Sequence, residues 1–260
     1  METTEKEIAF LRGLTVEPDW TQGFTDFFDE TVKIGEPKTL TYLNAGAGNH
    51  AIEIFEKLGM KTDLFPVCET PELQEYAQLK ANTAKIEIDF STNKPMGTSD
   101  FVVTDASLQN PDEIAGLAKE SAAAATNRVV MFLPTFGSFG EIFSFLWEVL
   151  LDLEIEGKNA GIEALISDQT NIDTIEAIFR DLALRKIKTH QKTINFDFEN
   201  GKEFAESLLM KNFFFPKWLD FLDEKDEERV INKLAQKIDE ESEGLSFRFT
   251  VKATIVEARH

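Results

Sequence analysis

The fold is decided by the stretch TLTYLNAGAGNHAIEIFEKL, residues 39–58. A short β-rich run at 39–43 leads into a turn that contains Gly46 and Gly48, and an amphipathic run typical of a helix follows at 49–58. Two glycines between a strand and a helix leave bare backbone that a ligand can approach, and the first helical turn adds unpaired N–H groups. A Gly-x-Gly pair also serves as a plain tight turn, so the elements around it must distinguish the two interpretations.

Short β-rich runs alternate with longer helical runs along most of the remaining chain. This alternation predicts an α/β fold with a Rossmann-like, doubly wound, seven-stranded sheet that is mostly parallel. A helical extension at residues 1–37, with two helices over 5–34, is expected before the sheet domain at 38–260. The expected strands are 39–43, 62–68, 85–89, 101–104, 128–133, 186–198 and 246–258, and the expected helices are 49–58, 71–81, 111–125, 140–153, 172–182, 202–212 and 223–241.

Composition excludes several classes of protein. The 260 residues include 47 acidic and 27 basic side chains, and the net charge of −20 would repel a polyphosphate backbone, so no nucleic acid partner is expected. With Cys68 as the single cysteine, neither an intramolecular disulfide nor a thiolate-rich metal site can form, and no metal-ligand cluster is visible. No apolar run approaches the roughly 18 residues of a membrane span. These features favour an acidic, cytoplasmic protein, and they are compatible with a homodimer.

Three acidic residues follow predicted strands at the edge where the glycine turn lies. Glu69 stands 21 residues beyond Gly48, just past the second strand, where such folds place a carboxylate that accepts both hydroxyls of a ribose. Asp89 ends the third strand and could accept a hydrogen bond from an adenine amine, with Phe90 packing near the ring; otherwise it is an exposed strand-end acid. Asp105 follows the fourth strand and either faces the reactive end of a ligand or caps the next segment.

The glycine turn, NAGAGNH at residues 44–50, resembles the first motif of the class I S-adenosylmethionine-dependent methyltransferases, in which an acidic or polar residue precedes Gly-x-Gly-x-Gly. The resemblance covers nearly the whole chain: Glu69 and Asp89 match the acids of the second and third strands, and SDFVV at 99–103 resembles the segment that enters strand four. It implies an antiparallel last strand, which residues 247–258 suit. The residues that it assigns to cofactor binding are Asn44, Ala45, Gly46, Gly48, His50, Glu69, Asp89, Phe90 and Asp105.

Two residues depart from that motif. Asn44 stands where the family has an acid, and His50 replaces the third glycine. His50 either contacts the cofactor carboxylate or is a surface histidine near the helix N-terminus, and the second interpretation is favoured. Ala51 occupies the position of the third glycine in a dinucleotide fingerprint, which disfavours a nicotinamide-dependent oxidoreductase.

Candidates for chemistry are few. Asp105 and His190 are weak catalytic candidates; a histidine titrates near neutrality, but one in a strand is more often a packing or exposed residue. An apolar acceptor pocket could be lined by Trp20, Phe24, Phe136 and the aromatic patch at 213–218, although most of that patch is expected in the core. The charged helix at 223–241 is expected to be a solvated face.

The resemblance implies transfer of a methyl group from S-adenosylmethionine to a small-molecule, partly apolar acceptor. In some branches of this family, an Asn-Pro-Pro-Tyr type sequence after strand four is the signature of amine methylation. This chain has no such sequence there, so a nucleobase amine is not the expected acceptor. The alternative is a catalytically inactive protein of the same fold, in which Asn44 and His50 mark lost cofactor contacts and the acidic surface binds a protein partner.

Overall fold

The computed structural model describes residues 4–155, 157–242 and 245–260. Its contacts divide the chain into two compact units. Unit 1 comprises Met1–Pro134, Asn171–Lys192 and Ala253–His260, and unit 2 comprises Thr135–Thr170 and Thr193–Lys252. This division does not test the boundary expected between residues 37 and 38, which stays a prediction.

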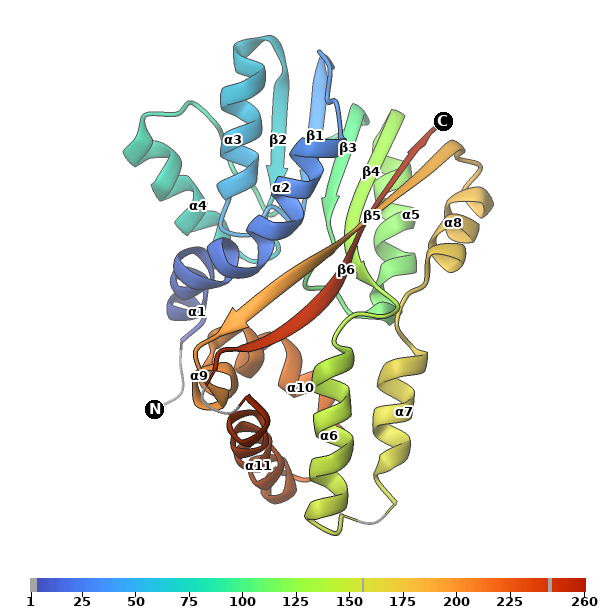
Figure 1. The fold of residues 1–260 in the computed structure, drawn as a ribbon. Coiled ribbons are helices and arrows are strands. Elements are labelled where there is room, and N and C mark those ends of the chain that lie inside the picture. Colours follow the sequence, from blue (N-terminus) through green and yellow to red (C-terminus); the bar gives the residue numbers. More distant parts are fainter. Residues whose placement is uncertain (1–3, 156, 243–244) are drawn as a thin grey trace. The chain divides into compact units, whose positions relative to one another are not determined.

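The sheet has six strands in the order β2-β1-β3-β4-β6-β5 among the described residues (Figure 1). β1 pairs in parallel with β2 and β3, and β3 pairs in parallel with β4. β6 runs antiparallel to both of its neighbours. The predicted α/β sheet, mostly parallel with an antiparallel last strand, is therefore confirmed. The strands are β1 (Thr39–Leu43), β2 (Asp63–Val67), β3 (Ser99–Asp105), β4 (Ala125–Thr135), β5 (Arg185–Phe198) and β6 (Phe247–Arg259).

The strand expected at residues 85–89, the third in chain order, is not formed, so the described sheet has six strands instead of seven. Two residues beyond that segment, Ser91 makes an isolated parallel bridge to Val67. The reason is a competing side chain: Gln78 lies on the preceding helix, its Nε2 donates to the Ile88 carbonyl at 3.0 Å, and its Oε1 accepts the Phe90 N–H at 2.9 Å. A backbone donor bonded in this way is not available to a strand ladder.

Helices of unit 1 pack on the parallel strands, and the N-terminal helical residues supply much of the core. Phe24 and Phe28 are fully buried, and their rings lie 6.3 and 6.1 Å from that of Phe132 on β4. Burying each such ring contributes about 1.5–3 kcal/mol. The helical segments of unit 1 are α1 (Glu5–Leu11), the π-helix η1 (Arg12–Thr21), α2 (Gln22–Thr31), α3 (Asn49–Leu58), η2 (Gly59–Lys61), α4 (Pro71–Ala84), η3 (Pro111–Glu113), α5 (Ile114–Ala124) and α8 (Ile172–Asp181).

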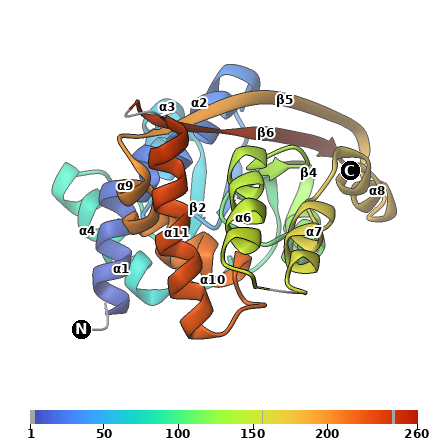
Figure 2. The same ribbon diagram turned by 60° about the horizontal axis from the view of Figure 1, so that its bottom comes forward.

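Unit 2, whose helices come forward in Figure 2, has an aromatic core. The Trp218 ring stacks on Phe214 at 4.7 Å and lies 5.0 Å from Phe139 and 5.1 Å from Phe143. The aromatic patch at 213–218 therefore lies largely in the core, as expected. The helical segments of this unit are α6 (Gly140–Asp152), α7 (Asn159–Ser167), α9 (Gly201–Glu206), η4 (Met210–Phe214), α10 (Phe215–Trp218) and α11 (Glu224–Ser242).

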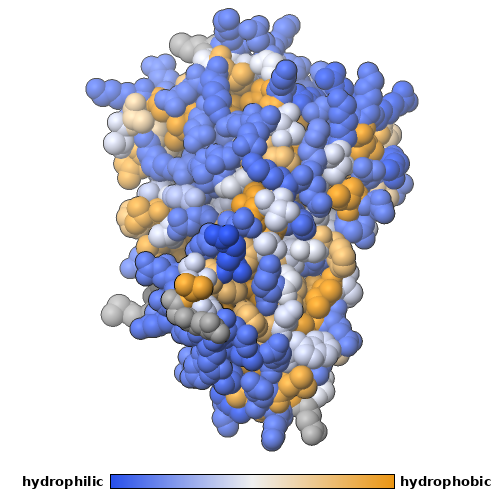
Figure 3. All heavy atoms as spheres, in the orientation of Figure 1, coloured by the Kyte–Doolittle hydropathy of each residue, from blue (hydrophilic) through white to orange (hydrophobic). Residues whose placement is uncertain are grey.

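The visible surface is mostly hydrophilic, with scattered apolar side chains (Figure 3). On α11, Val230, Leu234 and Ile238 are buried, whereas most of its charged residues are exposed. The expectation of a solvated face on this helix is met. Among the described residues, no helix combines the length and apolar character needed to cross a membrane.

Gly201 is expected to be intolerant of a side chain, because α9 and α11 touch there. A Cβ on Gly201 would overlap the carbonyl oxygen of Ala235 and lie 2.8 Å from its carbonyl carbon. We expect Gly201→Ala to lower the free energy of unfolding by about 2–3 kcal/mol, as measured by urea denaturation. Gly140→Ala is the matched control, since Gly140 also begins a helix and an added Cβ there meets nothing within 4 Å. Equal stability of the two variants would contradict the prediction.

Candidate functional site

The glycine turn has left-handed backbone at both glycines and packs against a neighbouring ring. Gly46 and Gly48 have φ angles of 58° and 88°. Ala45 N–H donates to the carbonyl of Val67 at 2.9 Å, which joins the turn to the end of β2. A Cβ on Gly48 would lie 2.7 Å from the Phe90 ring, so only glycine fits between the turn and that ring.

The structure brings several predicted site residues together at this turn. The Gly46 N–H donates to Glu69 Oε2 at 3.0 Å, and Asn44 Nδ2 donates to the backbone carbonyl of Asp105 at 3.0 Å. Asp89, in contrast, is exposed. The turn, the acid after β2 and the acid at the end of β3 therefore form one cluster.

Two residues that the sequence analysis did not select lie on the same turn. Glu17 accepts hydrogen bonds from the N–H groups of Ala47 and Asn49, the second at 3.3 Å. Arg12 Nη2 donates to Glu69 Oε1 at 2.6 Å. Both side chains come from η1, the π-helix that precedes α2. Arg12 and Glu17 are five residues apart, a spacing that aligns side chains in a π-helix but not in an α-helix, so helical periodicity gave no signal.

Charge balance inside the cluster depends on Arg12. Glu17 is 4% exposed and Arg12 is 8% exposed. Burial raises the pKa of Glu17, and Arg12, Lys80 and the two turn N–H groups partly oppose that rise. Burial alone would lower the pKa of Arg12, but Glu69 and Glu17 more than offset this, so that its pKa is raised. Arg12 is therefore the cation that holds the buried acids.

Asp105 is the second buried carboxyl of the cluster. It is 7% exposed, and burial raises its pKa to about 7, although its Oδ1 accepts the Ser107 N–H at 2.8 Å. It lines a cavity of about 10 Å³ together with Glu17, Tyr42 and His50. That volume admits about one water molecule.

His50 is a core residue, which corrects the expectation of a surface histidine. It is 5% exposed, and its ring makes edge contacts with Phe28, Tyr42 and Phe132 at centroid distances of 5.1–6.3 Å. Tyr42 Oη and His50 Nδ1 are hydrogen-bonded at 2.9 Å, and His50 Nε2 lies 3.6 Å from Asp29 Oδ1. The aromatic residues contributed by β1, β4 and α2 close around the ring, so the residue that replaces the third glycine points into the core.

The other predicted site residues lie elsewhere. His190 is exposed on β5. Trp20 and Phe24 are fully buried in the core of unit 1 rather than exposed to an acceptor. Phe136 is 55% exposed, and in unit 2 it lines a cavity of about 330 Å³ with Phe143, Trp147, Ile166 and Gln169, among others.

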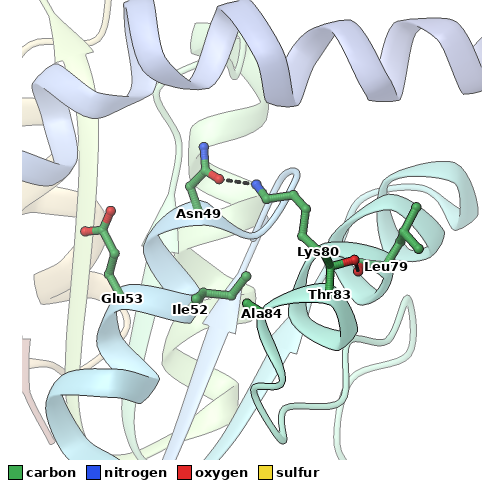
Figure 4. Close-up of a pocket in the computed structure, with 7 residues that line it drawn as sticks. All are labelled: Asn49, Ile52, Glu53, Leu79, Lys80, Thr83 and Ala84. Carbon is green, nitrogen blue, oxygen red and sulfur yellow. Dashed lines mark hydrogen bonds between the residues drawn. The ribbon is translucent and has the colours of Figure 1, made fainter.

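A wider groove lies on the outer side of the turn, between α3 and α4 (Figure 4). Its volume is about 510 Å³. Lys80 extends along it to hydrogen-bond Asn49 Oδ1, and it also donates to the Ala47 carbonyl at 3.1 Å. Burial lowers the pKa of Lys80. Lys80 therefore stabilises the turn through hydrogen bonds to Ala47 and Asn49. Among the described residues, no group of three or more His, Cys, Asp or Glu side chains is placed to hold a metal ion.

Similar structures were found among solved proteins only. No family model and no curated protein matches the chain. The YcgJ protein from Bacillus subtilis has a TM-score of 0.57 at 13% identity, over 92% of this chain and 98% of its own. Phosphoethanolamine N-methyltransferase 2 from Haemonchus contortus, in complex with S-adenosylhomocysteine, has a TM-score of 0.54 at 12% identity, over 99% and 58%. Magnesium protoporphyrin IX methyltransferase from Synechocystis, also with S-adenosylhomocysteine bound, has a TM-score of 0.50 at 14% identity, over 95% and 87%.

The chain thus has the fold of the class I S-adenosylmethionine-dependent methyltransferases. The sheet order and the antiparallel β6 agree with that assignment. At these identities the similarity is one of fold alone.

Proposed function

We propose that this chain is an S-adenosylmethionine-dependent methyltransferase that acts on a small-molecule, partly apolar acceptor. The observation that carries the proposal is the Gly46–Glu69 hydrogen bond of 3.0 Å, because it places a ligand-accessible glycine turn and a ribose-type acid at one edge of this sheet. A cytoplasmic location and the absence of a nucleic acid partner belong to the same proposal.

The residues at the turn have the chemical groups that the cofactor needs, but in this conformation they leave no room for it. Glu69 would accept the ribose hydroxyls, and the turn would meet the cofactor through backbone N–H groups. The cavity at the turn, however, measures about 10 Å³, whereas sites for such ligands measure about 300–1,000 Å³. Glu17 and Arg12 occupy the turn, and they would have to move before the cofactor enters.

When bound, the cofactor would supply a methyl group on a positively charged sulfur. The chain's own contribution is to bind and orient the two reactants and to exclude water. Asp105, with a pKa of about 7, is suited to hold or accept a proton near neutral pH. Phe136, which lines the cavity in unit 2, is the proposed contact for an apolar acceptor.

The second candidate is the non-catalytic protein of the same fold. One observation favours it: the Glu17 carboxylate satisfies the Ala47 and Asn49 N–H groups, so the turn needs no external ligand for its hydrogen bonds. In that case the acidic surface, rather than the turn, would be the functional part.

Calorimetric titration with S-adenosylhomocysteine separates the two candidates. We expect binding that Glu69→Ala weakens by about 10- to 100-fold, because hydrogen bonds to a charged group contribute about 1.5–3 kcal/mol. Glu72→Ala is the control, since it removes a carboxylate of the same kind three residues further on, in the first turn of α4. Absence of binding at millimolar ligand, both in the wild type and in Glu17→Ala, would reject the methyltransferase and favour the non-catalytic protein.

A further inference from the structure

We infer that Glu17 is an internal ligand of the glycine turn, and that η1 keeps the cofactor site closed until this carboxylate leaves. The inference takes the identity of the excluded cofactor from the proposed function. The contacts that occupy the turn all lie within unit 1.

The turn is shaped around the Glu17 carboxylate. Both carboxylate oxygens are used, one by the Ala47 N–H and the other by the Asn49 N–H. A Cβ on Gly46 would overlap Glu17 Oε1, so the bare backbone of that glycine is what admits the acid. These N–H groups, next to a left-handed glycine and at the start of α3, form the kind of concave donor array that binds anionic oxygen atoms.

Charged neighbours hold the acid in this position. Arg12 pairs with Glu69, and a Cβ on Gly46 would lie 3.1 Å from Arg12 Nη2 as well as against Glu17. Lys80 lies behind the turn and bonds the Ala47 carbonyl. η1 thus places the Arg12 guanidinium on Glu69, the acid that would hold a ribose. It also places the Glu17 carboxylate on the N–H donors of the turn. An entering cofactor would have to displace both contacts.

The backbone of η1 offers a route for the displacement. All ten residues from Arg12 to Thr21 are π-helical, the Gln22 N–H donates to the Glu17 carbonyl five residues back, and Pro18 lies inside the segment. π-Helices are rare and occur mostly as single turns, often at functional sites. A change to four-residue hydrogen bonding would rotate Glu17 about the helix axis and away from the turn, while Trp20 stays in the core.

Hydrogen exchange of the turn amides tests the occupation without any cofactor. We expect the Ala47 and Asn49 amides to exchange at least about tenfold faster in Glu17→Ala than in the wild type, and Glu17→Gln to fall between them. Sodium acetate, compared with sodium chloride at equal ionic strength, should restore protection in Glu17→Ala, because acetate can replace the missing carboxylate. Glu56→Ala removes an exposed charge from α3 and is the control for net charge. Unchanged amides of β3 would establish that each variant is folded.

Binding of S-adenosylhomocysteine to the same variants tests the closure. We expect Glu17→Ala to bind at least about tenfold more tightly than the wild type, since no internal carboxylate competes. Faster exchange with acetate rescue, but no binding by any variant, would support the internal ligand and reject the proposed methyltransferase. Unchanged exchange in folded Glu17→Ala, or equally tight binding by the wild type, would overturn the inference and leave the proposed function intact.

Discussion

Replacing Trp20 by alanine is expected to lower the free energy of unfolding by about 3–5 kcal/mol. The Trp20 ring is fully buried, lies 5.3 Å from the Phe24 ring, and donates its Nε1–H to the Ser107 carbonyl at 3.3 Å. Its removal leaves a large cavity and takes a hydrogen bond from the Ser107 carbonyl, two residues beyond Asp105. Urea denaturation followed by far-ultraviolet circular dichroism measures the loss.

Two variants serve as controls for Trp20→Ala. Trp147→Ala removes an equally large but partly exposed ring in unit 2, and we expect it to cost only about 1–2 kcal/mol. Trp20→Phe keeps an apolar ring and loses only the N–H donor, so its cost should also be smaller. If Trp20→Ala were no more destabilising than Trp147→Ala, Trp20 would not anchor η1 to the end of β3.

Asp105→Asn is expected to remove a pH-dependent loss of stability. The folded pKa of Asp105, about 7, lies above its ordinary value of 3.8, so the contribution of this group is complete below about pH 4 and is lost as the pH rises towards 7. The variant has no such titration. Between pH 5.5 and pH 8, the wild type should therefore lose about 2 kcal/mol relative to Asp105→Asn.

Urea denaturation of both proteins at several pH values measures that difference, starting at pH 5.5 because the isoelectric point is about 4.6. Asp112→Asn is the control, since Asp112 is exposed and should show no trend against the wild type. The asparagine oxygen can still accept the Ser107 N–H, so the fold is expected to survive the substitution. A difference that does not change with pH would show that Asp105 does not titrate in this range.

The sequence was sufficient to predict most of the order of elements, and to predict that the glycine turn, Glu69 and Asp105 lie at one edge of the sheet. The alternation of β-rich and helical runs, and the spacing from Gly48 to Glu69, depend on local patterns that a parallel sheet imposes on its own strands. The strand expected at 85–89 failed because a side chain of α4, Gln78, takes a backbone donor of the segment that follows it. No local pattern reports such a contact.

The occupants of the turn were not predictable in the same way. Arg12 and Glu17 both reach the turn because η1 is a π-helix. In an α-helix, two charged residues five positions apart would point in different directions and would look like unrelated surface charges. His50 was misassigned for a related reason. A histidine at the start of a helix is usually solvated, and its burial here depends on rings contributed by β1, β4 and α2, which lie far apart in the sequence.

The single cysteine of the chain gives it a built-in chemical reporter. Cys68 directly precedes Glu69, its side chain is buried, and burial raises the pKa of its thiol, so the closed conformation protects it from alkylating reagents both sterically and chemically. No other thiol competes for the label. The rate at which this sulfur is alkylated would therefore measure how often the carboxyl end of β2 becomes accessible to solvent. This measurement needs neither a mutation nor an added fluorophore.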